Sequence, residues 1–364
     1  MESLVSIAPE PWRDQSVFVT GHTGFKGGWL SSWLHQLGAR VHGYALEPPT
    51  TPAFFDAARV AAALASDVRA DLGDRAQLRS ALQQARPQVV FHLAAQSLVR
   101  ESYRDAPGTF ATNVMGTANL LEAVRETDSV RAVVVITTDK VYLNREWNQG
   151  YREADHLGGH DPYSASKAAA EIVAASYRAS FFTGPGVHPA RIATARAGNV
   201  IGGGDWANDR LVPDGLRAFA AGEPLRLRYP DAVRPWQHVL EPLAGYLQLA
   251  QQLLSPEGPR FARAWNFGPD EKSEATVLHV ARILARLWGD GAHVEAETGS
   301  EHPHEAGLLR LDSSAAREAL AWRPRWSLEQ ALERTVDWQR AMDRGDDMSA
   351  VSREQIRAYM AAPA

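Results

Sequence analysis

A glycine-rich turn places the strongest constraint on how this chain can fold. An apolar run at residues 17–20 is typical of a buried strand, and residues 30–37 carry apolar side chains at i, i+3, i+4 and i+7, one face of a helix. Between them lie Gly21, Gly24 and Gly27. Gly21 allows the turn out of the strand, Gly24 lets the backbone approach a pyrophosphate, and Gly27 allows close packing of the helix on the strand. The segment predicts a dinucleotide site at the first helix.

The rest of the amino-terminal half repeats this alternation. Further strands are expected within residues 40–45, 89–95, 132–137 and 191–195, and helices within 57–65, 112–126 and 164–181. Strands alternating with helices of this length favour right-handed βαβ units. We expect an α/β fold, a doubly wound parallel Rossmann sheet with a smaller C-terminal substrate lobe. Residues 1–200 form the NAD-binding domain in this interpretation, 201–364 form mainly the lobe, and 239–270 return to the sheet.

Composition excludes several classes of protein. The 364 residues have no cysteine, which rules out disulfides, thiolate catalysis and thiolate-bound zinc. The net charge of -5 gives no general attraction to nucleic acid or anionic lipid, and no apolar run approaches the ~18 residues of a membrane span. We therefore expect a cytoplasmic protein with no nucleic-acid or membrane partner.

The cofactor is expected to be NAD. The second strand ends near residue 45, where an acidic residue usually binds the adenosine ribose; Glu47 stands two residues later. Residues 45–51 contain no Arg or Lys to accept the 2′-phosphate of NADP.

Tyr163 and Lys167 have the spacing of a tyrosine base and its activating cation. Four residues apart on a helix, they share a face. A phenol of pKa ~10 must fall by about three units to act near neutrality, which requires ~4 kcal/mol. An ammonium ~4 Å away at an effective dielectric of ~20 supplies about that much. Thr138 closes an apolar strand and has a hydroxyl that can share the proton of a substrate alcohol.

Six segments together resemble one enzyme family. They are TGHTGFKG at residues 20–27, HLAAQSLVRESY at 92–103, NVMGTANLL at 113–121, TTDKVY at 137–142, RAGNVIGGGDW at 196–206 and RPWQHVLEP at 234–242. The chain resembles the extended short-chain dehydrogenase/reductase superfamily. Within it, the chain is most similar to the nucleotide-sugar 4,6-dehydratases, and among these to the group that uses CDP-glucose.

The resemblance implies a catalytic set. Tyr163 takes the C4 hydroxyl proton while hydride passes to NAD, Lys167 also binds the nicotinamide ribose, and Thr138 orients the hydroxyl. Asp139 acts as the acid at the C6 hydroxyl, and Lys140 as the base at C5. Many dTDP-sugar dehydratases have Glu where this chain has Lys140, whereas the CDP-glucose group has Lys.

The remaining site residues bind cofactor and substrate. For NAD the set, in part implied by the resemblance, is Gly21, Gly24, Phe25, Lys26, Gly27, Asp71, Leu72, Leu93, Ala94, Ala95, Tyr163 and Lys167. Asn113 is expected to support the active-site backbone. Because Arg presents paired donors to phosphate, Arg210 and Arg234, with Asn199, are expected at the sugar diphosphate, and Ser97 and Arg100 at the hexose. His302, His304 and Glu305 are metal-ligand types, but the reaction needs no metal and none is expected.

The partner expected is the nucleotide sugar CDP-glucose, together with further copies of the chain. Ile172, Val173, Tyr177 and Phe181 are more apolar positions than one packed helix face needs. By the resemblance, the helices at 112–126 and 164–181 would pair across a two-fold axis, giving a homodimer or homotetramer.

Two groups of alternatives stay open. One is a related enzyme: a 4,6-dehydratase for dTDP- or GDP-sugars, or a nucleotide-sugar 4-epimerase or reductase. An epimerase would have small or neutral groups in place of Asp139 and Lys140. The other is a non-enzymatic NAD-sensing protein, which would be expected to lose Tyr163 or Lys167.

Overall fold

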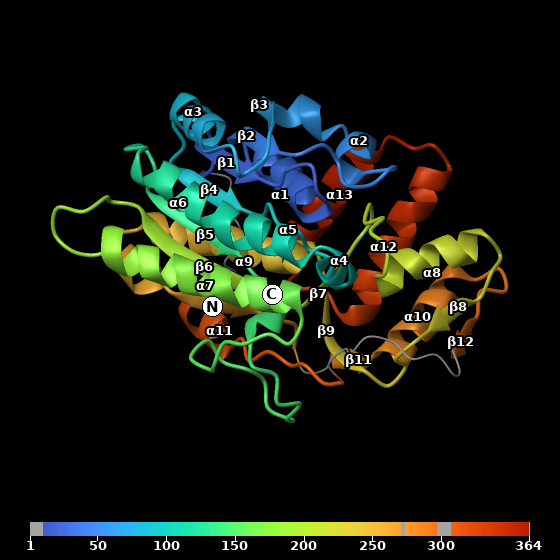
Figure 1. Cartoon of the computed structure of the whole chain (residues 1–364). Coiled ribbons are helices and arrows are strands. Elements are labelled where there is room, and N and C mark those ends of the chain that lie inside the picture. Colours follow the sequence, from blue (N-terminus) through green and yellow to red (C-terminus); the bar gives the residue numbers. More distant parts are fainter. Residues whose placement is uncertain (1–9, 271–273, 297–306, 364) are drawn as a thin grey trace.

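A parallel sheet of seven strands organises the molecule (Figure 1). The computed structural model describes residues 10–270, 274–296 and 307–363. The strand order is β10-β6-β5-β4-β1-β2-β3, and every pairing is parallel. The order in which strands are added to the sheet reverses between β1 and β4, which lie side by side. The expected doubly wound parallel sheet is confirmed. Its strands are β1 (Ser16–Thr20), β2 (Arg40–Ala45), β3 (Leu64–Arg69), β4 (Val89–His92), β5 (Ala132–Ile136), β6 (Arg191–Ala197) and β10 (Ala264–Phe267).

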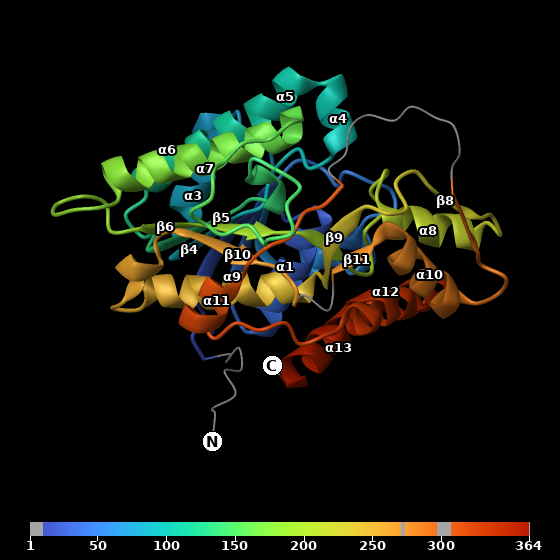
Figure 2. The same ribbon diagram turned by 90° about the horizontal axis from the view of Figure 1, so that it is seen from below.

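Helices cover both faces of this sheet (Figure 2). One face packs against α1 (Phe25–Gln36), α9 (Leu240–Leu254), α11 (Ser314–Ala319) and α13 (Met348–Ala361). The other is covered by α3 (Arg75–Ala85), α6 (Gly116–Arg125) and α7 (Pro162–Phe181), with α4 (Val99–Arg104) and α5 (Ala106–Phe110) beside them. The strands β1, β4 and β5 are buried on both sides, which explains their nearly continuous apolar runs.

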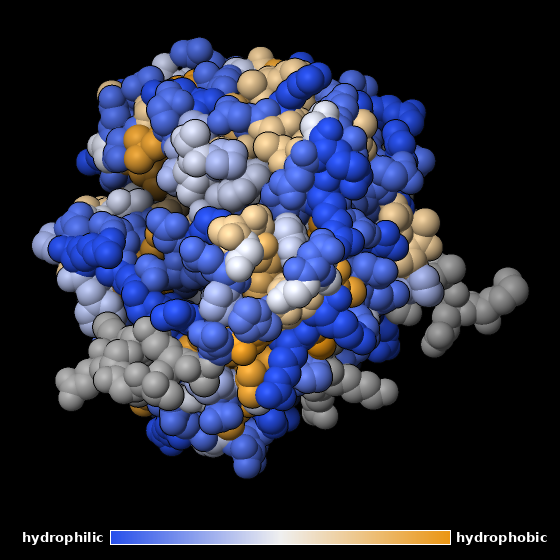
Figure 3. Space-filling model, turned by 90° about the vertical axis from the view of Figure 1, so that its right-hand side faces the viewer, coloured by the Kyte–Doolittle hydropathy of each residue, from blue (hydrophilic) through white to orange (hydrophobic). Residues whose placement is uncertain are grey.

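A smaller lobe stands at one end of the sheet. It has the three-stranded sheet β11-β9-β7 and the pair β12-β8, with its own apolar core. The helices are α8 (Leu211–Ala220), α10 (Val277–Trp288) and α12 (Leu328–Asp343); the strands are β7 (Asn199–Ile201), β8 (Leu225–Leu227), β9 (Val233–His238), β11 (Glu274–Thr276) and β12 (Val294–Ala296). The face of the molecule at this end is mainly hydrophilic (Figure 3). Segment 239–270 supplies α9 and β10 to the large layer.

Three expected elements differ from the structure. The single helix expected at residues 57–65 is wrong: α2 (Phe54–Ala57) ends there, a 3-10 helix spans Val60–Ala63, and β3 begins at Leu64. The strand expected at 89–95 ends at His92, so residues 93–95 form a loop. The helix expected at 112–126 contains a π-helical turn, Ala111–Met115. No helix among residues 10–270, 274–296 and 307–363 is both long and apolar enough to cross a membrane.

Candidate active site

The turn between β1 and α1 forms a cradle made of backbone. Gly21 has φ +76, and a Cβ there would lie 2.6 Å from the backbone nitrogen of Ala94. A Cβ at Gly27 would lie 2.0 Å from the carbonyl oxygen of Gly21. Neither position accepts a side chain. The helix α1 begins directly after Gly24, so its N-terminal amides point toward this turn. These residues fit a dinucleotide pyrophosphate.

Side-chain hydrogen bonds fix the ends of β1 and β4 on either side of the cradle. Thr20 Oγ1 lies 2.7 Å from His92 Nδ1 and accepts a hydrogen bond from the backbone of Ala94 at 3.2 Å. Leu93 and Ala95 flank Ala94 in this loop. Asn113, on the π-helical turn, accepts from the backbone nitrogen of Gln96 and donates to its carbonyl oxygen, both at 2.9 Å. The loop after β4 is therefore held rigidly beside Gly21.

The end of β2 has a cationic neighbour that sequence reasoning missed. Arg69, the last residue of β3, lies 3.0 Å from Glu47 Oε2 and 2.7 Å from Asp67 Oδ1. Residues 45–51 have no cation of their own, but the adjacent strand brings one, with two carboxylates beside it. Further along, Asp71 Oδ1 accepts from the Gly73 amide at 2.6 Å. Leu72 is buried against α6.

Tyr163 and Lys167 lie on the first two turns of α7. Asp161 caps this helix by accepting a hydrogen bond from the Ser164 amide at 2.9 Å, and Pro162 occupies its first position. Both Tyr163 and Lys167 are buried. The Lys167 ammonium donates to the carbonyl oxygen of Ile136 at 3.0 Å, which anchors it to the end of β5.

The pKa of Tyr163 is not lowered as expected. Burial raises the pKa of the phenol to about 12; the Thr138 hydroxyl and the Arg210 charge act to lower it, and the Asp139 charge to raise it. Burial also lowers the pKa of Lys167 to about 8. Burial is the largest cause for both groups, because a low-dielectric interior disfavours the charged phenolate and the charged ammonium alike.

Thr138, Asp139 and Lys140 form a compact turn at the end of β5. Thr138 Oγ1 donates to Asp139 Oδ1 at 2.9 Å and accepts from the Lys140 amide at 3.3 Å. Asp139 is 1% exposed, and its Oδ2 has no hydrogen-bond partner among the described residues. Burial raises the pKa of this carboxyl, with the Lys140 charge acting against it. The arrangement suits a carboxylic acid that holds a proton to donate.

Lys26 lies closer to the catalytic side chains than its position in the glycine-rich segment suggested. Its Nζ lies 3.4 Å from the hydroxyl of Tyr246, which α9 contributes. Burial lowers the pKa of Lys26 to about 7, and the charges of Lys167 and Arg210 act in the same direction. Nothing in the local sequence around Tyr246 indicated this contact, because it joins residues 26 and 246.

The arginines expected at the substrate meet the catalytic turn from the lobe. Arg210 donates to Asp205 Oδ2 at 2.8 Å and to Ser97 Oγ at 3.4 Å, and its charge lowers the pKa of Tyr163. Arg234, 6% exposed on β9, acts in the same way on Asp139.

Asn199 and Arg100 are the two other residues expected at the substrate whose positions the structure gives. Asn199 begins β7, half-buried and opposite Trp236 of β9. Arg100 is engaged in an ion pair, with its Nη1 3.0 Å from Asp209 Oδ1.

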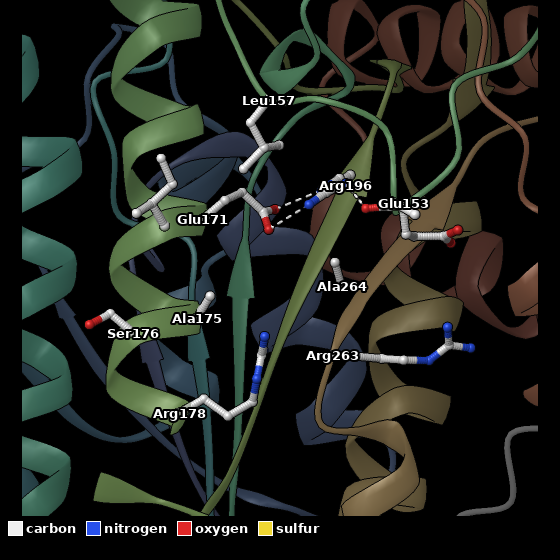
Figure 4. A pocket seen from close by; sticks show the side chains of 11 residues that line it. Glu153, Leu157, Glu171, Ala175, Ser176, Arg178, Arg196, Arg263 and Ala264 are labelled. Atoms are coloured by element: carbon white, nitrogen blue, oxygen red, sulfur yellow. Dashed lines mark hydrogen bonds and ion pairs between the residues drawn. The ribbon is translucent and has the colours of Figure 1, made fainter. Parts of the chain in front are cut away.

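A cavity of about 590 Å³ lies next to the catalytic helix, on the side of β6 and β10 (Figure 4). Glu171, one turn beyond Lys167, lines it and accepts hydrogen bonds from Thr137 at 2.5 Å, Thr194 at 2.6 Å and Arg196 at 3.0 and 2.9 Å. The Glu171 carboxylate thus fixes Thr137, the residue that precedes Thr138. In the described ranges no cluster of three or more His, Asp or Glu has the arrangement of a metal site, and His302, His304 and Glu305 lie outside those ranges.

Comparisons with known proteins agree on one enzyme family. The family model described as GDP-mannose 4,6 dehydratase matches residues 18–335. The chain is 49% identical over 353 residues to CDP-glucose 4,6-dehydratase from Salmonella typhimurium, covering 96% of this chain and 98% of that protein. It is 30% identical to dTDP-glucose 4,6-dehydratase from Streptomyces antibioticus, covering 89% and 92%. The solved structure of MoeE5 with UDP-glucose and NAD is 26% identical, with a TM-score of 0.74 over 90% of this chain and 99% of that one.

Proposed function

Because the chain belongs to the GDP-mannose 4,6-dehydratase family, we propose that it converts CDP-D-glucose to CDP-4-dehydro-6-deoxy-D-glucose and water. The choice of CDP-glucose rests on the 49% identity, over nearly the whole chain, to an enzyme with that activity. The structural observation that carries the chemistry is the buried turn of Thr138, Asp139 and Lys140 beside Tyr163. The Thr138 hydroxyl and the Asp139 charge of this turn both act on Tyr163, which supports the proposed chemistry.

Oxidation at C4 requires a base on the alcohol. NAD held by the glycine turn of residues 21–27 would supply the hydride acceptor for C4 and the hydride donor for C6, so the overall reaction is redox-neutral. Tyr163 takes the C4 hydroxyl proton, and the Thr138 hydroxyl orients that alcohol. Deprotonation of the phenol must overcome its buried setting. The Arg210 guanidinium, whose charge lowers the pKa of the phenol, supplies positive charge for this step, and we assign the Lys167 ammonium the same role from the next turn of the helix.

Elimination follows once C4 is a ketone, because the C5 proton is then acidic. Lys140, as its neutral amine, takes the C5 proton, and the electron pair of that C–H bond forms the C5–C6 double bond. Asp139 donates a proton to the C6 hydroxyl, which leaves as water. The raised pKa of the Asp139 carboxyl favours the protonated acid that this step requires. Hydride addition at C6 and return of a proton to C5 complete the product.

The lobe recognises the nucleotide diphosphate in this proposal. Arg210, Arg234 and Asn199 bind the diphosphate, and Ser97 with Arg100 faces the hexose. The charge of Arg210 acts on Tyr163 and that of Arg234 on Asp139, which supports this placement. The corresponding division of the chain is a cofactor domain of residues 1–200 with segment 239–270, and a substrate lobe made mainly of residues 201–364.

We further propose that the enzyme works in the cytoplasm as a homodimer or homotetramer, without nucleic-acid or membrane partners. The helices α5, α6 and α7 lie side by side on one face (Figure 1). Four large apolar side chains are exposed on them and on the intervening π-helical turn: Phe110 at 39%, Met115 at 56%, Ile172 at 59% and Phe181 at 38%. A second copy of this face would cover them.

A substrate panel tests the proposed function. Purified protein loaded with NAD is incubated separately with CDP-, dTDP-, GDP- and UDP-glucose, and the 4-keto-6-deoxy sugar is measured by its absorbance in alkali and by mass spectrometry. We expect product from CDP-glucose at a kcat/KM well above the other three. Preference for another nucleotide sugar would overturn the assignment of cytosine as the nucleotide base. A changed C4 configuration without loss of water would make the protein an epimerase.

A further inference from the structure

Asp209 links an arginine of the cofactor side to an arginine of the lobe through one carboxylate oxygen. Its Oδ1 lies 3.0 Å from Arg100 Nη1 and 3.2 Å from Arg228 Nη1. Arg100 belongs to α4, which follows the cofactor strand β4, whereas Arg228 follows β8 in the lobe. The two arginines are thus held by the same anion from opposite sides.

This bridge lies next to the reacting groups. The residue after Asp209 is Arg210, which donates to Ser97 on the cofactor side and whose charge acts on Tyr163. Asp209 itself has φ +61, a left-handed backbone that Asp and Asn tolerate better than most residues. Its carboxylate is therefore turned by the backbone toward both arginines at the entrance to the site.

The two arginines around Asp209 suit an anion that is larger and more highly charged than the Asp209 carboxylate. Arg100 and Arg228 carry two positive charges, and Asp209 offsets one of them. The side chains of Arg100, Arg228 and Asp209 are 31%, 24% and 34% exposed, so solvent and ligands reach the bridge. Ion pairs this exposed are weak and are readily exchanged. A diphosphate presents two negative charges and several acceptor oxygens to the same guanidinium groups.

We propose that Asp209 is a built-in competitor of the substrate diphosphate: its carboxylate holds Arg100 and Arg228 until the diphosphate replaces it, and Asp209 thereby sets the affinity for the nucleotide sugar. The proposal rests on the proposed function for the identity of that substrate. It differs from the proposed function in one respect, since Arg100 meets the diphosphate here instead of the hexose. It adds that the bridge between cofactor side and lobe is broken in every round of substrate binding.

The test is Asp209→Asn, which keeps the shape and the backbone preference and removes the charge. Calorimetric titration of the NAD-loaded protein with CDP should show about three- to tenfold tighter binding than wild type, since a like charge near the two phosphates is removed. Cytidine, which has no phosphate, should bind both proteins equally. Glu257→Gln, which breaks an exposed ion pair with Arg260, serves as the control and should change neither affinity.

Inorganic pyrophosphate separates this proposal from the assignment of the nucleotide. If CDP does not bind but pyrophosphate binds Asp209→Asn more tightly, the choice of CDP-glucose fails and the role of Asp209 stands. Equal or weaker binding of pyrophosphate and CDP by a variant with the wild-type circular dichroism spectrum would refute the competition. So would an equal gain in cytidine affinity, because the effect would then not depend on phosphate charge.

Discussion

Replacing Asp139 by Asn should separate the acid's contribution to catalysis from its cost to stability. The carboxyl is 1% exposed, and its Oδ2 accepts no hydrogen bond from the described residues. An amide fills the same space but cannot donate a carboxylic proton to the C6 hydroxyl. Loss of a general acid typically costs ~10²–10⁴-fold in rate, so kcat for product formation should fall by that factor. Oxidation at C4 should persist, because Tyr163 and Thr138 are untouched.

The same variant should gain stability at neutral pH. Burial raises the pKa of Asp139 in the folded protein above its unfolded value. Folding therefore favours the protonated carboxyl. The stability that this carboxyl allows the wild-type protein is fully present below the unfolded pKa and is lost as the pH rises through the folded pKa. Asn cannot ionise, so the Tm of Asp139→Asn should exceed that of wild type at neutral pH, and the difference should shrink as the pH falls toward the unfolded carboxyl pKa.

The assays are steady-state turnover and thermal unfolding across a pH series, with Asp128→Asn as a control at an exposed carboxylate. The control should leave kcat unchanged and show no comparable gain in Tm. Turnover of Asp139→Asn within a few-fold of wild type would remove Asp139 from the acid role. A lower Tm than wild type at neutral pH would show that the carboxylate is charged and stabilised in the folded protein.

Four other substitutions test the catalytic groups, the cofactor turn and the subunit interface. Tyr163→Phe should stop both oxidation and dehydration, whereas Lys140→Ala should oxidise C4 and then stall, seen as reduced-cofactor absorbance without product; near-normal turnover of Lys140→Ala would remove it from the base role. Gly27→Ala should purify without NAD, because its Cβ would lie 2.0 Å from the Gly21 carbonyl oxygen. The cofactor released on denaturation measures this, and a full cofactor content would contradict the assignment of the glycine turn as the cofactor site. Ile172→Glu should give a one-chain mass in sedimentation where wild type gives two or four, since it places charge on a 59% exposed apolar position of α7; a one-chain wild type would refute the oligomer.

Much of the fold could be predicted because its strands are buried on both faces. The apolar runs that became β1, β2, β5 and β6 stand out from the polar helix surfaces around them. The edge strand β3 did not stand out, because it has the sequence LASDVR and its residues are exposed or half-buried. An edge strand needs neither an apolar run nor strict alternation, and the alanines before it were therefore taken for a helix.

The site was predictable where chemistry follows local spacing and unpredictable where it depends on distant contacts. Tyr163 and Lys167 share a helix face, and Thr138 to Lys140 are consecutive, so their proximity follows from the sequence. Long-range neighbours, such as Tyr246 beside Lys26, arise from chain crossings that no local pattern records. The pKa of Tyr163 was misjudged because burial of the phenol, which local spacing does not show, outweighs the charges that act to lower the pKa.

One isotope experiment tests the central claim of a redox-neutral 4,6-dehydration most directly. CDP-glucose deuterated at C4 is converted by the NAD-loaded enzyme in ordinary water, without added cofactor, and the product is analysed by NMR and mass spectrometry. The account predicts that the deuterium moves from C4 to C6 and that one solvent hydrogen enters at C5. Deuterium lost to solvent or to released reduced cofactor, or retained at C4, would contradict it.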